Sequence, residues 1–302
     1  MTEQKTILVT GATGAQGGSV ARHLLKDNQF AVRCLTRNVN SDGATDLKQL
    51  GVEVVQGDLD EINSLQAAME GCYGVFGVTN FWEHFEKEYQ QGKNPVDAVA
   101  ASDVQHFVFS TLPSAKKISD GALEVPHFDF KGQLEDYARD RNLNATFIHI
   151  AFYYENFLSF FPPQKQADGT YSFGFPQGDT PLAAVSVEDL GGAVAGVFNN
   201  PDEYKGKVVG VVGEDLPPSR YAEIMTRVLE QTIVYQYIPQ EVFASFGFPG
   251  ADDLANMFEF NRLYIPNRQE DLLESRKLYP QVQTFESWVS KNKDKFQPIL
   301  QG

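Results

Sequence analysis

Cysteine and long apolar runs are both scarce in this sequence of 302 residues. The two cysteines, Cys34 and Cys72, lie inside apolar stretches and cannot by themselves form a four-ligand zinc site. We expect them to be buried thiols, a usage that suits a reducing cytoplasm. The N-terminus lacks the long apolar core of a signal peptide, and no stretch reaches the roughly 18 apolar residues of a membrane-spanning helix. The sequence therefore predicts a cytoplasmic protein that does not span a membrane.

Positive charge is scarce as well. Lys and Arg number 25 against 40 Asp and Glu, which gives a net charge of −15. Proteins that bind nucleic acid directly need a basic surface to meet the phosphate backbone. The charge balance therefore opposes direct nucleic-acid binding, although regulation through a protein partner stays open. The content of hydrophobic residues, 42%, and of charged residues, 22%, is ordinary for a globular protein.

The first half of the chain alternates two periodicities. Short, continuously apolar runs are separated by segments with helical spacing, which predicts βαβ units and a parallel sheet that is buried on both faces. We therefore expect an α/β fold with a doubly wound parallel sheet. The expected strands are residues 5–10, 30–36, 52–56, 73–79, 106–111 and 145–151. The expected helices are residues 17–25, 42–50, 62–70, 89–102 and 127–141.

The pattern changes after residue 151. Residues 171–175 alternate like a hairpin strand, and Ser186 with Asp189 has the spacing of a capping box before a long apolar helix. Residues 207–212 are expected to form another buried strand, and 284–295 a final amphipathic helix. We expect a first domain at 1–155 and a smaller, mostly helical C-terminal lobe at 156–302, with some segments of the lobe returning to the sheet.

A glycine-rich turn follows the first expected strand and opens the first expected helix. The sequence GATGAQG, residues 11–17, has GxxGxxG spacing. In dinucleotide-binding Rossmann folds the first glycine permits the tight turn, the second lets the backbone approach the pyrophosphate, and the third lets helix pack on strand. The free N–H groups at the helix N-terminus then attract phosphate. This context predicts a Rossmann domain that binds NAD(P).

Arg37 indicates which dinucleotide is bound. An NAD site usually places Asp or Glu at the end of the second strand to hold the ribose 2′-hydroxyl, but here Thr36, Arg37 and Asn38 occupy that place. A guanidinium group binds phosphate through two parallel donors. NADP(H) is therefore favoured over NAD(H). At neighbouring strand ends, Asp58 could accept a hydrogen bond from the adenine amino group, and Thr79 begins a segment on the same edge.

Seven segments together resemble the NmrA-like family, an atypical branch of the short-chain dehydrogenases/reductases. They read GATGAQGGSVARHLL, RCLTRN, VVQGD, VTNFWE, PHFDFKGQLEDYARD, YYENFLSFFPPQK and FGFPGADDLANMF. The resemblance covers essentially the whole chain and is strongest to the NADPH-sensor subgroup. By this resemblance the dinucleotide is lined by Gly11, Ala12, Thr13, Gly14, Ala15, Gln16, Gly17, Arg37, Asn38, Asp58, Leu59, Thr79, Asn80, Phe81, Lys131, Tyr153, Tyr154, Glu155 and Asn156.

The resemblance implies two functions. In the sensor subgroup, bound NADP(H) sets conformation, oligomeric state and protein partners, which leaves room for a regulatory partner or a homodimer. Related branches are instead NADPH-dependent oxidoreductases that reduce quinone-like or other small carbonyl or aromatic acceptors. One departure is visible, because this chain has Gln90 where the sensor has a Lys. The phosphate or ribose contact of that Lys is here either missing or supplied by Lys93.

The usual catalytic pair of the superfamily, Tyr-x-x-x-Lys, is incomplete. Lys131 is present, but His127 stands at the Tyr position, while Ser110 and Thr111 stand where the superfamily's Ser would be. Lys131 is expected to hold the nicotinamide ribose, and it is the candidate catalytic residue if the protein turns over a substrate. His127 is a substitute acid, a helix-start residue without a chemical role, or a ligand contact without proton transfer.

Two further expectations concern the surroundings of this site. Phe160, Phe161 and Phe246 are expected to line a cavity beyond the segment 153–156. The acidic residues from Glu83 to Glu88 are expected to form a solvated face or a mobile loop over the cofactor.

Overall fold

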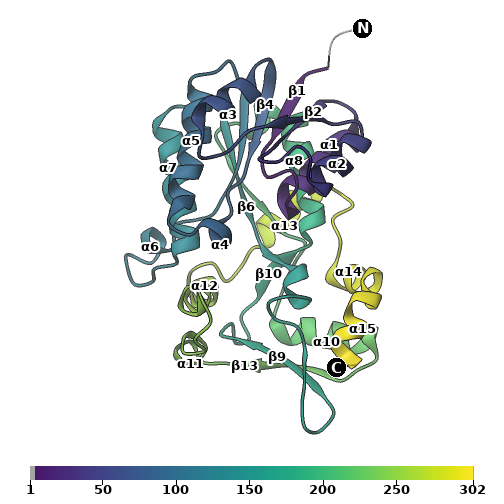
Figure 1. Cartoon of the computed structure of the whole chain (residues 1–302). Coiled ribbons are helices and arrows are strands. Elements are labelled where there is room, and N and C mark those ends of the chain that lie inside the picture. The colour runs from purple at the N-terminus through teal and green to yellow at the C-terminus, as the bar shows by residue number, and fades with distance from the viewer. Residues whose placement is uncertain (1–3, 302) are drawn as a thin grey trace. The chain divides into compact units, whose positions relative to one another are not determined.

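The computed structural model describes residues 4–301 and divides into two compact units (Figure 1). Unit 1 comprises the chain up to Ser114 together with His127–Ile150 and Val187–Val209. Unit 2 comprises Ala115–Pro126, Ala151–Ser186 and the chain from Gly210 on. Each unit is therefore assembled from segments that are distant in the sequence.

A seven-stranded sheet runs through unit 1. Its strand order is β11-β6-β5-β4-β1-β2-β3, and each neighbouring pair from β6 to β3 is parallel. The order reverses between β1 and β4, which is the switch point beside which doubly wound sheets bind ligands. The strands are β1 (Thr6–Val9), β2 (Ala31–Thr36), β3 (Glu53–Gln56), β4 (Cys72–Gly77), β5 (His106–Thr111), β6 (Ala145–Ile150) and β11 (Val208–Val211).

Helices cover both faces of this sheet (Figure 1). Helices α3, α5 and α7 lie on one face, and α1, α2 and α8 on the other. Close contact of α1 with α8 requires Gly191, because a Cβ there would lie 2.3 Å from the Ser19 carbonyl oxygen. The helices of unit 1 are α1 (Ala15–Asp27), α2 (Asp42–Gln49), α3 (Ile62–Met69), α4 (Phe81–His84), α5 (Lys87–Ala100), α7 (Pro126–Asp140), α8 (Val187–Asn199) and α9 (Pro201–Tyr204).

Unit 2 contains two small sheets and several helices. One sheet has the order β12-β10-β7 and the other β13-β9-β8. Phe175 and Phe258 stack in the aromatic core of unit 2, with ring centroids 4.4 Å apart. The strands are β7 (Phe152–Tyr153), β8 (Gln164–Lys165), β9 (Tyr171–Phe175), β10 (Leu182–Val185), β12 (Glu214–Leu216) and β13 (Ile233–Tyr237). The helices are α6 (Ala115–Ile118), the 3-10 helix η1 (Tyr154–Phe157), α10 (Pro218–Leu229), α11 (Gln240–Ala244), α12 (Ala251–Tyr264), α13 (Gln269–Leu278), α14 (Phe285–Lys291) and α15 (Lys293–Gln301).

The predicted α/β fold with a doubly wound parallel sheet is confirmed. Strands β5 and β9 have the predicted bounds, and the other predicted strands and helices of the first half are present with ends shifted by up to two residues. Some features differ. The short helices α4 and α6 were not predicted, and the expected final helix is two helices that are interrupted at Asn292, whose backbone N–H bonds the Trp288 and Val289 carbonyls.

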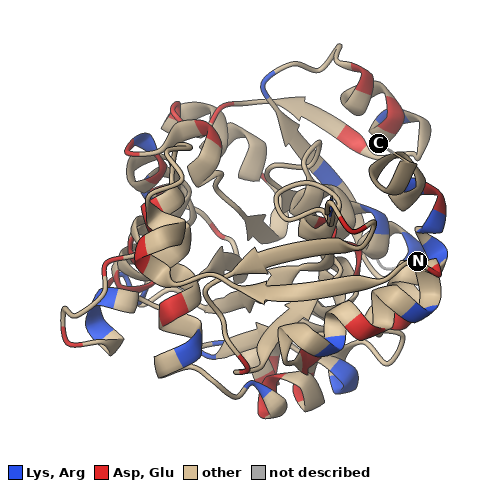
Figure 2. Ribbon diagram, turned by 90° about the horizontal axis from the view of Figure 1, so that it is seen from below, with Lys and Arg blue, Asp and Glu red and all other residues tan. Residues whose placement is uncertain are grey.

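Both cysteines are free and buried, as predicted. Burial raises the pKa of the Cys34 thiol to about 12, so this thiol is inert at neutral pH. Within residues 4–301, no helix combines the length and the apolar character that crossing a membrane requires. Lys and Arg are interspersed with Asp and Glu along the helices (Figure 2).

His106 gives a testable pH dependence. Its ring is fully buried on β5, with Nε2 2.8 Å from the Thr146 hydroxyl, and desolvation lowers its pKa to about 4. In the unfolded chain the His106 ring takes up a proton near pH 6.5. The contribution of neutral His106 to the free energy of unfolding is therefore complete above that pH and is lost as the pH falls toward 4. The loss should reach about 3 kcal/mol.

Denaturant unfolding of wild type and His106→Gln at pH 7 and pH 4 measures this effect. The difference between their free energies of unfolding should shift by about 3 kcal/mol in favour of the variant at pH 4. Equal pH dependence of the two proteins would exclude His106 as the cause.

Candidate dinucleotide-binding site

The glycine turn lies at the switch point of the sheet. The Val78 backbone N–H donates to the Thr10 hydroxyl over 3.0 Å, which joins the carboxyl ends of β1 and β4. Gly11 has φ +59°, and a Cβ there would lie 2.8 Å from the Val78 side chain. Only glycine meets both demands without strain. The backbone conformation and the packing at residue 11 therefore both require glycine.

The start of α1 leaves donors open for an anion. Thr13, Gly14 and Ala15 are exposed, although the Gly14 N–H donates to the Gly11 carbonyl oxygen over 2.9 Å. The first turn of α1 carries no acidic residue that would oppose the positive helix end. At Gly17 an added Cβ would lie 2.3 Å from the Gly11 carbonyl oxygen, so this glycine lets the helix pack directly on the turn. These are the properties that a pyrophosphate site needs.

Arg37 and Asn38 follow β2 at the same edge. The Arg37 guanidinium is exposed and pairs with Glu83 over 2.9 Å, across 46 residues of sequence. This hydrogen bond raises the pKa of Arg37 and lowers that of Glu83. The Asn38 side chain accepts the Asn40 backbone N–H over 2.9 Å and shapes the turn. Arg37 therefore presents a cation in solvent, held by an exchangeable partner.

Asp58 and Leu59 follow β3. Asp58 Oδ1 accepts the Asp60 backbone N–H over 3.0 Å, and the Leu59 carbonyl accepts from Asn94 Nδ2 over 2.7 Å. Gln90 donates to Asn94 over 2.7 Å, and the Lys93 ammonium lies 5.0 Å from the Tyr137 ring centroid. In this structure, neighbours on α5 and α7 therefore engage both Gln90 and Lys93.

Lys131 lies in a buried ion pair. Its ammonium is 2.6 Å from Glu88 Oε1, 2.8 Å from the Thr79 hydroxyl and 3.3 Å from the Thr79 carbonyl oxygen. The Thr79 hydroxyl donates to the same Glu88 oxygen over 2.7 Å. Lysine has three N–H donors, so in this arrangement all three are used within the protein.

Glu88 was not identified from the sequence, and the expectation of a solvated acidic face was wrong at this residue. Glu88 is fully buried, and its Oε2 has no hydrogen-bond partner among the described residues. Helical spacing contains a signal that could have found it. Gly92, Val96 and Val99 line the buried face of α5, and a step of four residues back from Gly92 reaches Glu88.

His127 occupies the first turn of α7 in an aromatic setting. Its ring centroid lies 5.2 Å from that of Trp82 and 5.9 Å from that of Phe81, and its side chain is buried. Asn80 is exposed, and its amide lies 3.3 Å from Glu83. These residues place α4 between the end of β4 and the start of α7. The three interpretations of His127 remain predictions.

Ser110, at the superfamily's Ser position, lies on the carboxyl edge of β5. Its hydroxyl donates to Gln16 Oε1 over 2.7 Å, which joins β5 to the first turn of α1. The Thr111 hydroxyl lies 3.2 Å from Glu135. Both hydroxyls thus support the architecture of unit 1.

The segment 153–156 belongs to unit 2. Tyr154 is fully buried, and its ring centroid lies 5.1 Å from that of Phe285. Glu155 accepts hydrogen bonds from the Ser186 hydroxyl over 2.7 Å and from the Trp288 indole over 3.2 Å. Tyr154 and Glu155 therefore stabilise unit 2. Contact of Tyr153, Tyr154, Glu155 and Asn156 with a cofactor remains a prediction.

The residues of unit 1 fit an NADP(H) molecule by their chemistry. The open turn and helix start offer N–H donors to a pyrophosphate, and Arg37 offers an exposed guanidinium to a 2′-phosphate. Among the described residues, no cluster of His, Cys, Asp or Glu is arranged to hold a metal ion.

Comparison with known protein families finds a match to nearly the whole chain. Residues 3–289 match the NmrA-like family. An NmrA-like family domain-containing oxidoreductase, hkm9 from Aspergillus hancockii, is 36% identical over 274 residues, which are 84% of this chain and 82% of that protein.

Two solved structures share the fold. NmrA, a negative transcriptional regulator solved in complex with NADP, has a TM-score of 0.84 at 24% identity and covers 98% of this chain and 97% of its own. The same regulator has also been solved with NAD. The NADPH-dependent quinone oxidoreductase QOR2 from Escherichia coli, complexed with NADPH, has a TM-score of 0.79 at 22% identity and covers 94% of this chain and 99% of its own. On the match of residues 3–289 and the 36% identity to hkm9, the chain belongs to the NmrA-like family.

Proposed function

We propose that this protein binds NADP(H) in unit 1 and acts as a sensor and regulator that responds to NADP(H), with α4 and the start of α5 as the responsive segment. The observation that carries this proposal is the buried contact of Lys131 with Glu88 and Thr79. It uses every donor of the candidate catalytic lysine, and no tyrosine stands four residues before it. This arrangement disfavours proton transfer from Lys131 to a substrate, and so favours a sensor over a reductase.

The ion pair of Arg37 with Glu83 couples the cofactor to α4. Exposed ion pairs contribute about 0–1 kcal/mol, so a 2′-phosphate that takes two donors of Arg37 can displace Glu83. Glu83 lies on α4, and its release removes one of the contacts that hold this helix. NAD(H) has no 2′-phosphate and would leave the pair in place. The segment would then report the phosphorylated dinucleotide specifically.

Strain in the backbone marks the same segment. Phe85 ends α4 with φ 45° and ψ −119°, a conformation that non-glycine residues seldom adopt. Such residues cost of order 1–3 kcal/mol and concentrate at switch regions. Release of α4 would let Phe85 relax, which supplies a driving force for rearrangement. A protein partner or a second copy of the chain could then bind the rearranged α4 segment.

Limited proteolysis tests the sensor. Saturating NADPH is expected to change cleavage between Trp82 and Lys87, while saturating NADH leaves it as in the free protein. Glu83→Gln removes the pair in advance, so this variant should be cleaved alike with and without NADPH. Identical digestion of the wild type in all three states, with NADPH binding shown by calorimetry, would contradict the proposal.

A second candidate is an NADPH-dependent oxidoreductase. The observation that favours it is the 36% identity to a relative described as an oxidoreductase. A quinone could accept a hydride from NADPH and a proton from water to give a neutral hydroquinone, NADP⁺ and hydroxide, which needs proximity and orientation more than a protein acid.

Loss of NADPH absorbance with a panel of quinones, aldehydes and dyes separates the two functions. Consumption that saturates with acceptor and disappears in Lys131→Ala, with a circular dichroism spectrum showing that the variant is folded, would establish the reductase. Consumption equal to that of the protein-free mixture, together with tight NADPH binding, would favour the sensor.

A further inference from the structure

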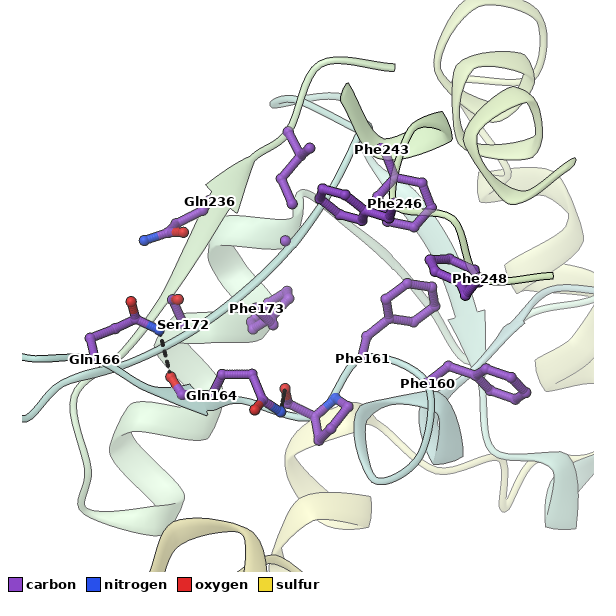
Figure 3. Close-up of a pocket in the computed structure, with 13 residues that line it drawn as sticks. Phe160, Phe161, Gln164, Gln166, Ser172, Phe173, Gln236, Phe243, Phe246 and Phe248 are labelled. Carbon is purple, nitrogen blue, oxygen red and sulfur yellow. Dashed lines mark hydrogen bonds between the residues drawn. The ribbon is translucent and has the colours of Figure 1, made fainter. Parts of the chain in front are cut away.

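A pocket of about 460 Å³ lies wholly within unit 2, beside β8, β9, β13 and α11 (Figure 3). None of its residues was predicted to touch the dinucleotide. Phe160, Phe161 and Phe246 were expected to line a cavity, and they do. The lining residues are Phe160, Phe161, Pro162, Gln164, Gln166, Ser172, Phe173, Gly174, Gln236, Ile238, Phe243, Phe246 and Phe248.

The walls of the pocket are mostly phenylalanine rings. Phe243 contacts three of them, with centroid distances of 6.3 Å to Phe161, 5.3 Å to Phe246 and 5.8 Å to Phe248. Phe160, Phe246 and Phe248 expose 66%, 50% and 40% of their surface. A group of large apolar side chains left open in this way is characteristic of a binding surface. The buried ring of Phe243 holds the exposed ones in place.

The other end of the pocket is polar but uncharged. Gln164, Gln166, Ser172 and Gln236 lie together there, and no lining residue is ionisable (Figure 3). Ser172 is 5% exposed, and its hydroxyl makes no hydrogen bond to any residue from 4 to 301. This hydroxyl lines the pocket, where its donor and acceptor capacity is available to a ligand.

We propose that this pocket binds a neutral, planar aromatic molecule of two or three rings that carries a hydroxyl or carbonyl group at one end. The volume lies within the roughly 300–1,000 Å³ of small-molecule sites. The phenylalanine rings stack on or pack edge-on against an aromatic ligand, and the Ser172 hydroxyl with the amides pairs its polar group. The absence of ionisable lining residues disfavours an anion or a cation, which would lose hydration without a partner charge.

This site is independent of the proposed function. Its residues belong to unit 2 alone, and a ligand can be titrated in the absence of nucleotide. A result at this pocket therefore neither supports nor contradicts NADP(H) binding, and a failure of the sensor proposal would leave it intact.

Calorimetric titration with three matched probes tests the ligand class. The probes are 2-naphthol, which is neutral and aromatic, 2-naphthoate, which is anionic, and 2-decalol, which is saturated. We expect 2-naphthol to bind with a Kd on the order of 10–100 µM and the other two at least about tenfold more weakly.

Two variants test the place of binding. Phe246→Ala removes a half-exposed wall ring and should weaken 2-naphthol about tenfold without unfolding the protein. Ser172→Ala should reduce the affinity for 2-naphthol to that for naphthalene. Leu273→Ala, which truncates an apolar side chain that is 66% exposed on α13 and outside the pocket, is the matched control and should bind as the wild type does.

Three outcomes would overturn the proposal. They are no binding of 2-naphthol at millimolar concentration, equal affinity for all three probes, and equal binding of 2-naphthol by wild type and Phe246→Ala. A folded circular dichroism spectrum of each variant accompanies the titrations, so that loss of binding is read only from folded protein.

Discussion

Glu88→Gln is expected to lower the free energy of unfolding by about 3–5 kcal/mol, because it leaves the Lys131 ammonium buried beside a neutral amide. Glu88 is fully buried and Lys131 is 8% exposed, so water cannot replace the lost carboxylate. The Thr79 hydroxyl would lose its charged acceptor in the same change. The measurement is denaturant unfolding at pH 7, followed through a probe of unit 1.

The pair offers an internal control. In the double variant Glu88→Gln with Lys131→Met neither member is charged, and most of the lost stability should return. Glu223→Gln breaks an exposed pair with Arg220 on α10 and should change stability by about 1 kcal/mol or less. A Glu88→Gln protein as stable as Glu223→Gln would show that the buried pair contributes little. A double variant weaker than either single variant would show that the two side chains do not act as a pair.

The sequence was sufficient for the local parts of this fold. Strand β5 has the sequence HFVFST and is buried along its whole length, and α7 has helical spacing. Each element could therefore be predicted from its own residue pattern. The glycine turn was equally readable, because the positive φ at Gly11 and the close approach of Gly17 to Gly11 arise within a few residues of chain. Helix α4 has only four residues, which is too short to show a period.

The site was only partly predictable, because its electrostatics depend on long-range contacts. Lys131 and Glu88 are 43 residues apart, and Arg37 and Glu83 are 46 apart. Neither spacing marks a pair in a single sequence. Arg37 was predicted from the chemistry of the dinucleotide and Lys131 from the superfamily's Tyr-x-x-x-Lys motif. Their two carboxylate partners were predicted only as members of an acidic run that forms a solvated face or a mobile loop, without the ion pairs. Glu88 and Glu83 pair with Lys131 and Arg37, and these pairs determine how each cation can contact a ligand.

Arg37→Glu is expected to lower the affinity for NADPH about a thousandfold and to change the affinity for NADH by no more than about threefold. The variant removes the two-donor contact with the 2′-phosphate and places a carboxylate next to Glu83, Asp58 and Asp60, whose charges all act on this position. A thousandfold change corresponds to about 4 kcal/mol. Calorimetric titration with each dinucleotide at one fixed ionic strength measures both affinities.

Two further variants make the result specific to Arg37. Arg220→Glu reverses an exposed charge in unit 2 and should leave both affinities unchanged. Glu83→Gln frees the guanidinium and should strengthen NADPH binding up to about fivefold, since an exposed pair contributes about 0–1 kcal/mol. If Arg37→Glu instead weakened NADPH and NADH equally, Arg37 would be supporting the turn rather than reading the 2′-phosphate. The Arg37–Glu83 pair could then not distinguish the two dinucleotides, and the sensor mechanism would lose its trigger.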